Sequence, residues 1–302
     1  MKKEIKTKKE AWLHAVRLRT LPLALASIFA GSFLAAWKGD FRWEILLLAS
    51  LTTIFLQILS NLSNDYGDTV HGADSADRQG PVRAVQSGLI SLPEMKRAMY
   101  LFGLFSLVSG LLLLYLAVQD WKLFALFLAL GLVAIWAAIS YTSGKNPYGY
   151  AGLGDISVFV FFGLLGVLGT FYLHTLSFDP LAVVIAISLG CFSTAVLNIN
   201  NIRDIESDQK AGKRSIPVRI GRKAAVQYNW ALLVTGYICL IGFAILSDHV
   251  FSLLASLTWP LMMKVALGVQ NAKTSAETDP FLKKMAISTL LWVILFGIGI
   301  LI

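Results

Sequence analysis

Long apolar runs recur through almost the whole sequence, and they limit the possible fold more than any other feature. A helix needs about 20 predominantly apolar residues to cross the hydrocarbon core of a bilayer. Nine runs of about that length occur, at 21–37, 43–63, 95–117, 121–140, 154–173, 181–201, 224–246, 250–270 and 282–302. Because a backbone in lipid must satisfy its own polar groups, these runs predict spanning helices. The chain is therefore expected to be an all-α, polytopic membrane protein.

The composition agrees with this prediction and argues against a soluble protein. Of the 302 residues, 56% are hydrophobic and 15% are charged, whereas soluble domains carry about 25% charged residues. No separate soluble domain fits between the runs, so residues 1–302 are expected to form one transmembrane domain, with 1–20 as its basic N-terminal segment. Cys191 and Cys239 lie within apolar runs, which indicates packed thiols rather than a disulfide framework.

The basic residues predict how the chain lies in the membrane. If the N-terminus is inside, 22 of the 26 Lys and Arg fall in inner segments, and only Lys38, Arg42 and Lys122 fall in outer connections. The positive-inside rule then places the N-terminus on the cytoplasmic side. The formal net charge of +8 is thus explained by topology rather than by nucleic-acid binding, and the sequence shows no obligatory protein partner.

Two polar stretches interrupt the apolar pattern, and both fall on the predicted cytoplasmic side. The first runs from Asn61 to Asp74 and the second from Asn200 to Arg214. Each follows an apolar run and leads into a basic stretch with Pro-Val-Arg, at 81–83 and 217–219. This repeat predicts two pseudo-symmetric halves whose motifs face one another across a central cavity. Ionisable groups at the membrane are functional by default.

Oxygen-bearing side chains in both motifs predict a magnesium site. Asp204 and Asp208 are four residues apart, and Asp65 and Asp68 are three apart with Asn64 beside them, so each pair lies on one face of a helix. Carboxylate and amide oxygens without His or Cys favour Mg²⁺, which shares its remaining positions with substrate phosphates. Helix capping also explains one such motif by itself, but two on the same side favour a site.

Cations beside these carboxylates predict a phosphate-rich substrate. Arg and Lys side chains bind phosphate oxygens, although the positive-inside bias would also place basic residues here. Metal and cations together stabilise a departing diphosphate. The carbon left behind would be an allylic cation, sheltered in a water-poor cavity and attacked by an electron-rich aromatic acceptor.

These residues resemble the UbiA superfamily of intramembrane aromatic prenyltransferases. The resemblance rests on 64–68 with a later Asp, on Asp204-x-x-x-Asp208, on 212–214 and on the early stretch 17–22. The family has nine transmembrane helices, two Asp-rich motifs and magnesium-dependent prenyl transfer, in agreement with the helix count above.

The resemblance assigns a role to individual residues. It implies Mg²⁺ binding by Asn64, Asp68, Asp74, Asn201, Asp204 and Asp208, with Asn200 as an alternative to Asn201. It implies that the catalytic carboxylates are Asp65, Asp68, Asp204 and Asp208, although Asp65 is alternatively a residue that orients its neighbours. It implies diphosphate binding by Arg78, Arg83, Lys145, Lys213 and Arg214. The residues expected to face the acceptor or the cation are Tyr141, Asp155 and His71. The simpler interpretations are that Tyr141 is an interfacial tyrosine and that Asp155 caps a helix.

Three stretches, 80–88, 147–155 and 200–204, resemble the branch that prenylates 1,4-dihydroxy-2-naphthoate in menaquinone biosynthesis. Gly72 stands where ubiquinone-type members often carry a third Asp. The resemblance implies transfer from polyprenyl diphosphate with loss of diphosphate and CO₂, giving demethylmenaquinol, in the cell inner membrane. Two alternatives stay open. One is transfer to 4-hydroxybenzoate or another aromatic acceptor. The other is an ion-coupled transporter, because two repeated halves with carboxylates at the membrane are also typical of transporters.

Overall fold

The computed structural model describes residues 6–72 and 83–302, and every regular element in these ranges is a helix. The first half contains α1 (Lys8–Val16), η1 (Leu18–Thr20), α2 (Leu21–Trp37), α3 (Trp43–Val70), α4 (Leu92–Ala117), α5 (Trp121–Ser140), α6 (Gly154–Val158) and η2 (Phe159–Leu168). The second contains α7 (Gly169–Thr175), α8 (Pro180–Arg203), α9 (Ile205–Lys210), α10 (Ile216–Ser247), η3 (Val250–Thr258), α11 (Trp259–Asn271) and α12 (Ser275–Leu301).

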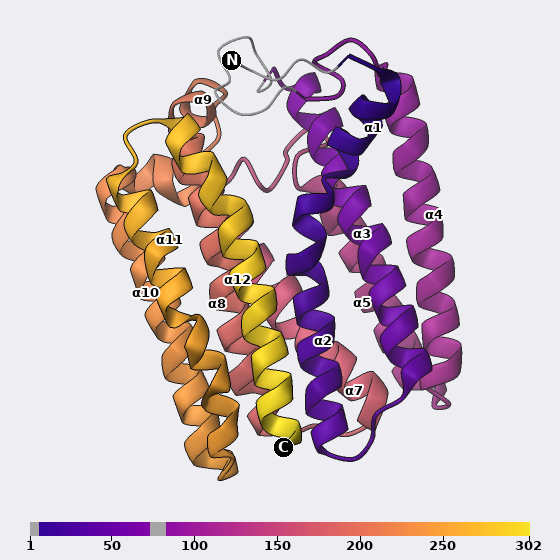
Figure 1. Cartoon of the computed structure of the whole chain (residues 1–302). Coiled ribbons are helices and arrows are strands. Elements are labelled where there is room, and N and C mark those ends of the chain that lie inside the picture. The colour runs from indigo at the N-terminus through magenta and orange to yellow at the C-terminus, as the bar shows by residue number, and fades with distance from the viewer. Residues whose placement is uncertain (1–5, 73–82) are drawn as a thin grey trace.

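Nine stretches of helix in the described ranges are long and apolar enough to cross a membrane, which confirms the predicted number. They run side by side as a single bundle (Figure 1). The main difference from prediction lies at the motifs. The second span continues through the first motif to Val70, whereas the seventh, within α10, is kinked at Gly221 (φ 80°), so its unbroken part begins close to the predicted residue 224. The motif residues are therefore held largely on helices rather than in loops.

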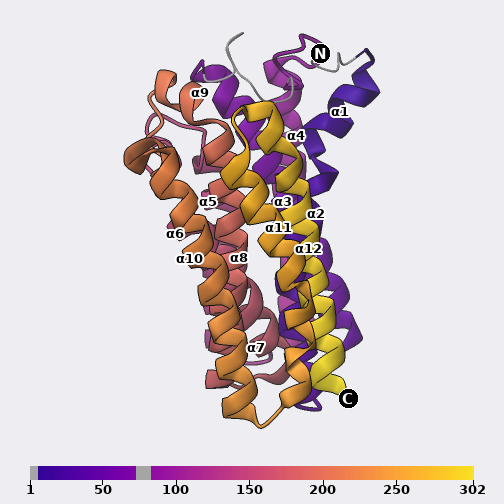
Figure 2. The same ribbon diagram turned by 60° about the vertical axis from the view of Figure 1, so that its left-hand side comes forward.

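The helices pack in two groups that α2 joins. In one group α3 packs on α4 and α5; in the other, α8 packs on α10, α12 and η2. α2 packs on α3, η2 and α12, and so contacts both groups (Figure 2). The second group holds the largest apolar core, in which the Phe192 and Trp292 rings lie 5.3 Å apart and are fully buried. Burial of such aromatic side chains is a main source of packing energy.

Small residues bring η2 unusually close to α8. A Cβ atom on Gly163 would lie 2.6 Å from the Cα of Gly190 and 2.7 Å from the carbonyl oxygen of Ala186. No side chain fits at that distance, so glycine at 163 is required by the packing of the two backbones. The segment 159–168 is wound as a π-helix, a form that often occurs at functional sites.

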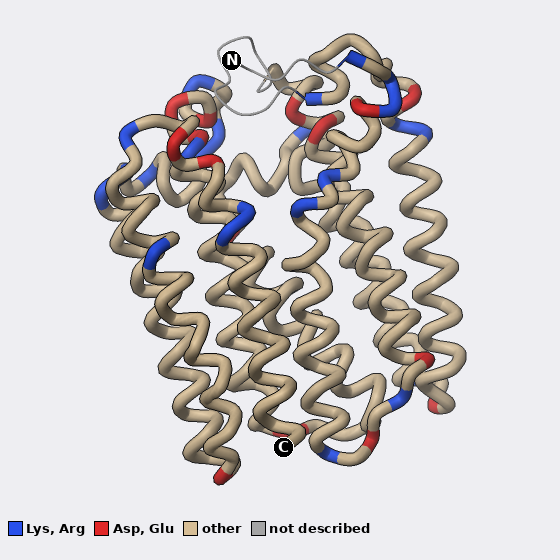
Figure 3. Tube along the Cα trace, in the orientation of Figure 1, with Lys and Arg blue, Asp and Glu red and all other residues tan. Residues whose placement is uncertain are grey.

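Charged side chains gather at one end of the bundle. Lys, Arg, Asp and Glu are concentrated at the end where α1 and α9 lie, and the opposite end carries few (Figure 3). Apolar side chains dominate the helix surfaces between the two ends, including the exposed Tyr115, Trp136 and Ile245. This distribution is that of a multi-pass membrane protein.

Candidate active site

A cavity of about 800 Å³ lies inside the bundle and joins a charged end to an apolar chamber. Its charged end is lined by described residues of both motifs. The chamber is lined by α2, α3, α4, α5, η2 and α7, with side chains that include Ile28, Leu113, Phe127, Leu165 and Leu173. The cavity therefore suits a molecule with an ionic head and a long apolar tail.

Lys213 joins the two motifs at the charged end. Its Nζ lies 2.9 Å from Asp68 Oδ1 and 3.6 Å from Asp208 Oδ1. Arg83 donates to the other Asp68 oxygen at 3.0 Å, and the Tyr150 hydroxyl donates to Oδ1 at 3.0 Å. Asp68 and Asp208 are 3% and 8% exposed, so these charges interact with little screening by water.

Asp65 holds the chain that follows the first motif. Its carboxylate accepts hydrogen bonds from the backbone N–H groups of Ala84 at 3.0 Å and Val85 at 3.3 Å. These bonds tie residues 84 and 85 to α3 and set Arg83 beside Asp68. Asn64 Oδ1 accepts a bond from Thr142 Oγ1 at 3.1 Å. The geometry supports the orienting alternative for Asp65.

Asp204 has a different environment from Asp208. Arg203 Nε donates to Asp204 Oδ1 at 2.7 Å, and a second guanidinium nitrogen lies 2.5 Å from Oδ2. Arg203 also contacts Asp279 Oδ1 at 2.6 Å, and Arg19 lies 3.7 Å from Oδ2 of the same Asp279. The second motif is thereby connected to α12 and η1.

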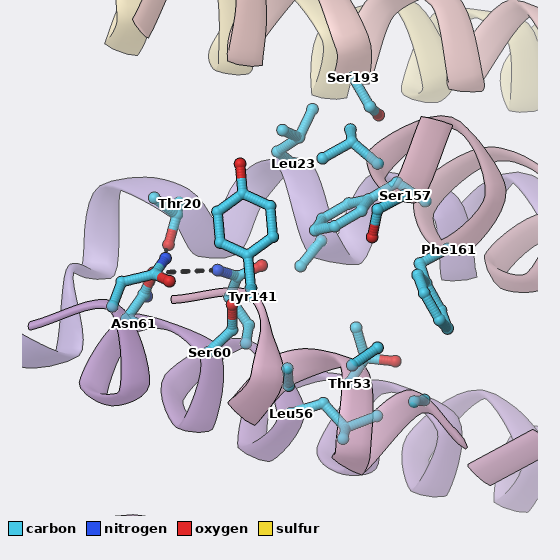
Figure 4. A pocket seen from close by; sticks show the side chains of 18 of the residues that line it. Thr20, Leu23, Thr53, Leu56, Ser60, Asn61, Tyr141, Ser157, Phe161 and Ser193 are labelled. Carbon is cyan, nitrogen blue, oxygen red and sulfur yellow. Dashed lines mark hydrogen bonds between the residues drawn. The ribbon is translucent and has the colours of Figure 1, made fainter. Parts of the chain in front are cut away.

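Most of the predicted site residues in the described ranges line this one cavity. They are Asn64, Asp65, Asp68, Arg83, Tyr141, Asp155, Asn200, Asn201, Asp204, Asp208 and Lys213. Tyr141 stands inside the cavity rather than in an interfacial belt (Figure 4). Burial raises the pKa of its phenol, and the negative charge of Asp155 adds to the effect, so the group stays neutral.

Three predicted residues do not line the cavity. Lys145 and Arg214 are exposed and lie outside its lining. The structure does not bring these two side chains to the lining of the charged end, and their role in diphosphate binding stays a prediction. His71 is also exposed; its Nδ1 lies 2.8 Å from the Gly67 carbonyl oxygen, and its ring faces Tyr150. Asp74 and Arg78 lie outside the described residues.

Several cavity residues escaped the sequence prediction. They are Arg17, Arg19, Tyr150, Arg203 and Lys283. Arg203 stands inside the second motif, and Arg17 and Arg19 precede the first spanning helix, so their positions gave a usable signal. Tyr150 also lies within one of the stretches that carry the resemblance, at 147–155, whereas Lys283 gave no signal, because only the folded chain brings it to the cavity.

The donor set fits a magnesium ion that is shared with a phosphate-bearing ligand. In the described parts of the chain, no three His, Cys, Asp or Glu side chains form a group that would hold a metal by themselves. Carboxylate oxygens of Asp68 and Asp208 and amide oxygens of Asn64 and Asn201 nevertheless line the same cavity. Mg²⁺ usually takes one or two carboxylates and keeps waters and substrate phosphates as its other ligands, which these residues can provide.

Fold and site together define a membrane-embedded protein whose cavity takes an anionic head group and an apolar chain. Comparison with known families gives the identity of this class. The UbiA prenyltransferase family matches residues 24–294. The chain belongs to this family, which confirms the resemblance found in the sequence and decides against an ion-coupled transporter.

Relatives and solved structures agree with this assignment. The chain is 45% identical over 304 residues to the 1,4-dihydroxy-2-naphthoate octaprenyltransferase of Haemophilus influenzae, covering 100% of this chain and 99% of the relative. It is 45% identical to the enzyme of the same name from Escherichia coli, covering 96% and 95%. A UbiA homologue from Aeropyrum pernix has the same fold, with a TM-score of 0.68 at 17% identity, covering 94% of this chain and 98% of that one. A homologue from Archaeoglobus fulgidus, bound to GPP and Mg²⁺, gives 0.61 at 16% identity, covering 96% and 99%.

Proposed function

We propose that this chain transfers a polyprenyl group from polyprenyl diphosphate to 1,4-dihydroxy-2-naphthoate, releasing diphosphate and CO₂ and giving demethylmenaquinol. One observation carries the proposal: Asp68, Asp208, Lys213 and Arg83 gather at one end of a cavity whose remainder is an apolar chamber. The full-length similarity to two dihydroxynaphthoate octaprenyltransferases supports the choice of acceptor.

The diphosphate head would bind at the charged end. Lys213 and Arg83 already lie within 3.0 Å of Asp68 oxygens, and their donors would turn to phosphate oxygens when a head group enters. Arg17, Arg19 and Lys283 add positive charge to the same lining. Cations placed before the reaction stabilise charge that develops on a leaving group. The prenyl chain would lie along the apolar chamber.

Magnesium would be held by oxygens of Asp68 and Asp208, with Asn64 and Asn201 or Asn200 beside them. When bound, the ion neutralises the negative charge of the diphosphate and so lowers the barrier to its departure. Asp204 is paired with Arg203 in this structure. In this pairing the Asp204 carboxylate keeps the end of α8 in place. To bind the ion, Asp204 would have to turn away from Arg203.

The chemistry follows from this arrangement. The bond between prenyl C1 and the diphosphate oxygen breaks, and the electron pair leaves with the diphosphate. The allylic cation is held among apolar side chains, away from water that would trap it. The acceptor ring carbon that bears the carboxylate, made electron-rich by the ring hydroxyls, forms the new carbon–carbon bond. The carboxylate then leaves as CO₂, and its bonding electrons restore the aromatic ring.

The proposed site opens toward the cytoplasm at the cell inner membrane. Lys and Arg are concentrated at the end of the bundle that carries both motifs (Figure 3), and cytoplasmic ends of membrane proteins carry this excess. The acceptor is polar and water-soluble, so an opening on this side would receive it directly.

A membrane assay tests the proposal. Membranes containing the chain are given polyprenyl diphosphate, Mg²⁺ and either 1,4-dihydroxy-2-naphthoate or 4-hydroxybenzoate, and products are identified by mass. We expect a prenylated naphthoquinol that lacks the carboxyl group. Product from 4-hydroxybenzoate alone would support prenyl transfer as the reaction but would overturn 1,4-dihydroxy-2-naphthoate as the acceptor. No product from either acceptor would overturn the function.

A further inference from the structure

A small polar cluster lies in the cavity beside the charged end, and neither the diphosphate nor the metal uses it. Asp155 at the start of α6 and Ser193 on α8 both line the cavity. Asp155 is 7% exposed and Ser193 is fully buried. Thr194 Oγ1 donates to the Asp155 carbonyl oxygen at 3.5 Å, so the two segments are in contact here.

Both side chains are left with unsatisfied hydrogen-bonding atoms. Asp155 Oδ1 and Ser193 Oγ are buried, and neither has a hydrogen-bond partner. The Tyr228 phenol on α10 is close enough to interact electrostatically with the Asp155 carboxylate, but Oδ1 has no hydrogen-bond partner. A buried polar atom without a partner costs free energy, and such atoms in a cavity often await a ligand.

The simpler explanation, that Asp155 caps a helix, does not hold. The N-cap residue of α6 is Leu153, and no side chain caps this helix end. Asp155 lies in the first turn of α6, where a negative charge is favourable, but this position does not supply a partner for its buried Oδ1.

Tyr141 connects this cluster to the charged end. A Cβ atom on Gly154 would lie 2.7 Å from the Tyr141 hydroxyl, so the phenol sits against the residue that precedes Asp155. Asp155, Asp208 and Asp68 are all close enough to act on the Tyr141 phenol by charge. Figure 4 shows the Tyr141 ring standing in the cavity, with Leu23, Ser157 and Ser193 around the same space.

We propose that Asp155 Oδ1 accepts a hydrogen bond from a ring hydroxyl of the aromatic acceptor, with Ser193 Oγ and Tyr141 completing the hydroxyl-binding site. This inference rests on the proposed function and names the residues that select a dihydroxylated ring. A ring bound here lies between the apolar chamber and the diphosphate end, where the prenyl C1 would be. A carboxylate that accepts from a phenol also raises the electron density of the ring.

The test compares acceptor binding in wild type and Asp155→Asn. In the variant, an amide NH₂ replaces one of the two carboxylate oxygens and the negative charge is lost, so the acceptor hydroxyl meets a weaker acceptor or a second donor. We expect the KM for 1,4-dihydroxy-2-naphthoate to rise about tenfold or more, because a hydrogen bond to a charged group is lost. The KM for polyprenyl diphosphate should stay within twofold. Asp120→Asn, at an exposed helix cap, is the matched control.

A second measurement separates binding from a structural effect. The inhibition constants of 1-hydroxy-2-naphthoate and 4-hydroxy-2-naphthoate, each lacking one hydroxyl, are measured in both proteins. In wild type, the analogue without the bonded hydroxyl should bind more weakly, and Asp155→Asn should remove most of this difference. Ser193→Ala and Tyr141→Phe should each give a smaller change in the same direction, and they carry the test if Asp155→Asn does not fold.

The outcomes distinguish this inference from the proposed function. If Asp155→Asn changes neither the KM for the acceptor nor the ratio of the two analogues' inhibition constants, the hydroxyl-binding site is overturned. The proposed function still stands in that case, provided that the wild-type protein turns over. An equal rise in both KM values would also overturn it, since that result indicates a general structural role. Wild-type protein that prenylates no aromatic acceptor would instead overturn the proposed function.

Discussion

Lys213 Nζ lies 2.9 Å from Asp68 Oδ1, although 145 positions separate the two residues along the chain. The same nitrogen lies 3.6 Å from Asp208 Oδ1. One ammonium group therefore holds the carboxylates of both motifs at the charged end of the cavity. A metal ion bound between these two carboxylates would balance the same negative charges.

Replacing Lys213 tests this relationship. Lys213→Met keeps much of the side-chain volume and removes the charge, so Asp68 and Asp208 repel one another and the diphosphate loses a donor. We expect kcat/KM for polyprenyl diphosphate to fall at least tenfold, as for the loss of a charged hydrogen bond. Lys223→Met, on the exposed surface of α10, is the control and should leave kcat/KM unchanged. Equal activity in the two variants would exclude a role for Lys213 in donor binding.

Arg203 is expected to support stability more than chemistry. Arg203→Met leaves Asp204 buried with its main counter-ion missing, and breaking a buried pair on one side costs about 3–5 kcal/mol. Thermal unfolding in detergent should show a clear fall in Tm. The double variant Arg203→Met/Asp204→Asn should recover part of the loss, because the buried Asp204 charge is removed and the more exposed Asp279 still has Arg19 nearby. A Tm equal to wild type in the single variant would show that the pair adds no stability.

Gly67 is predicted to be irreplaceable at the first motif. A Cβ atom there would lie 2.3 Å from the Thr142 carbonyl oxygen and 2.5 Å from its carbonyl carbon, so α3 and the end of α5 would have to separate. Overpacking of this kind costs about 1–3 kcal/mol, and it would displace Asp68 one residue away. Gly67→Ala should lower both Tm and turnover. Gly242→Ala has open space around its Cβ and should be silent; similar results for both would refute the packing argument.

Removal of divalent metal should stop turnover. EDTA is expected to reduce product to background, and added Mg²⁺ should restore it, because the divalent ion neutralises the departing diphosphate. A binding readout is independent of turnover: inorganic diphosphate with Mg²⁺ should raise Tm in wild type, as any ligand selective for the folded state does. Asp68→Asn should remove most of this rise. A Tm rise of the same size in EDTA would argue against a metal at the site.

The sequence predicted the spanning helices well because lipid imposes a strong pattern on them. The runs 21–37 and 121–140 match α2 and α5 at both ends. The run 43–63 was predicted too short because polar residues follow it, yet α3 continues to Val70. Those polar side chains are satisfied by other parts of the chain, as Asp65 is by residues 84 and 85, so the helix does not need to end.

Pairing between distant residues was beyond the sequence. The π-helix at 159–168 and the close approach of Gly163 to α8 are features that no local pattern predicts. The motifs indicated Asp68 and Asp208 as site residues. Only the folded chain shows that Lys213 lies between these two carboxylates and that Arg203 forms an ion pair with Asp204. Lys145 and Arg214 were predicted from their positions in inner segments, and both turned out to be exposed.

The most direct test of the account replaces one carboxylate from each motif. Asp68→Asn and Asp208→Asn membranes are assayed beside wild type for the prenylated, decarboxylated naphthoquinol, with folded protein quantified in each. We predict that either change lowers turnover at least a hundredfold while the protein stays folded, because each removes a negative ligand from the metal and diphosphate end. Wild-type turnover in either variant would contradict the assignment of the active site to this cavity.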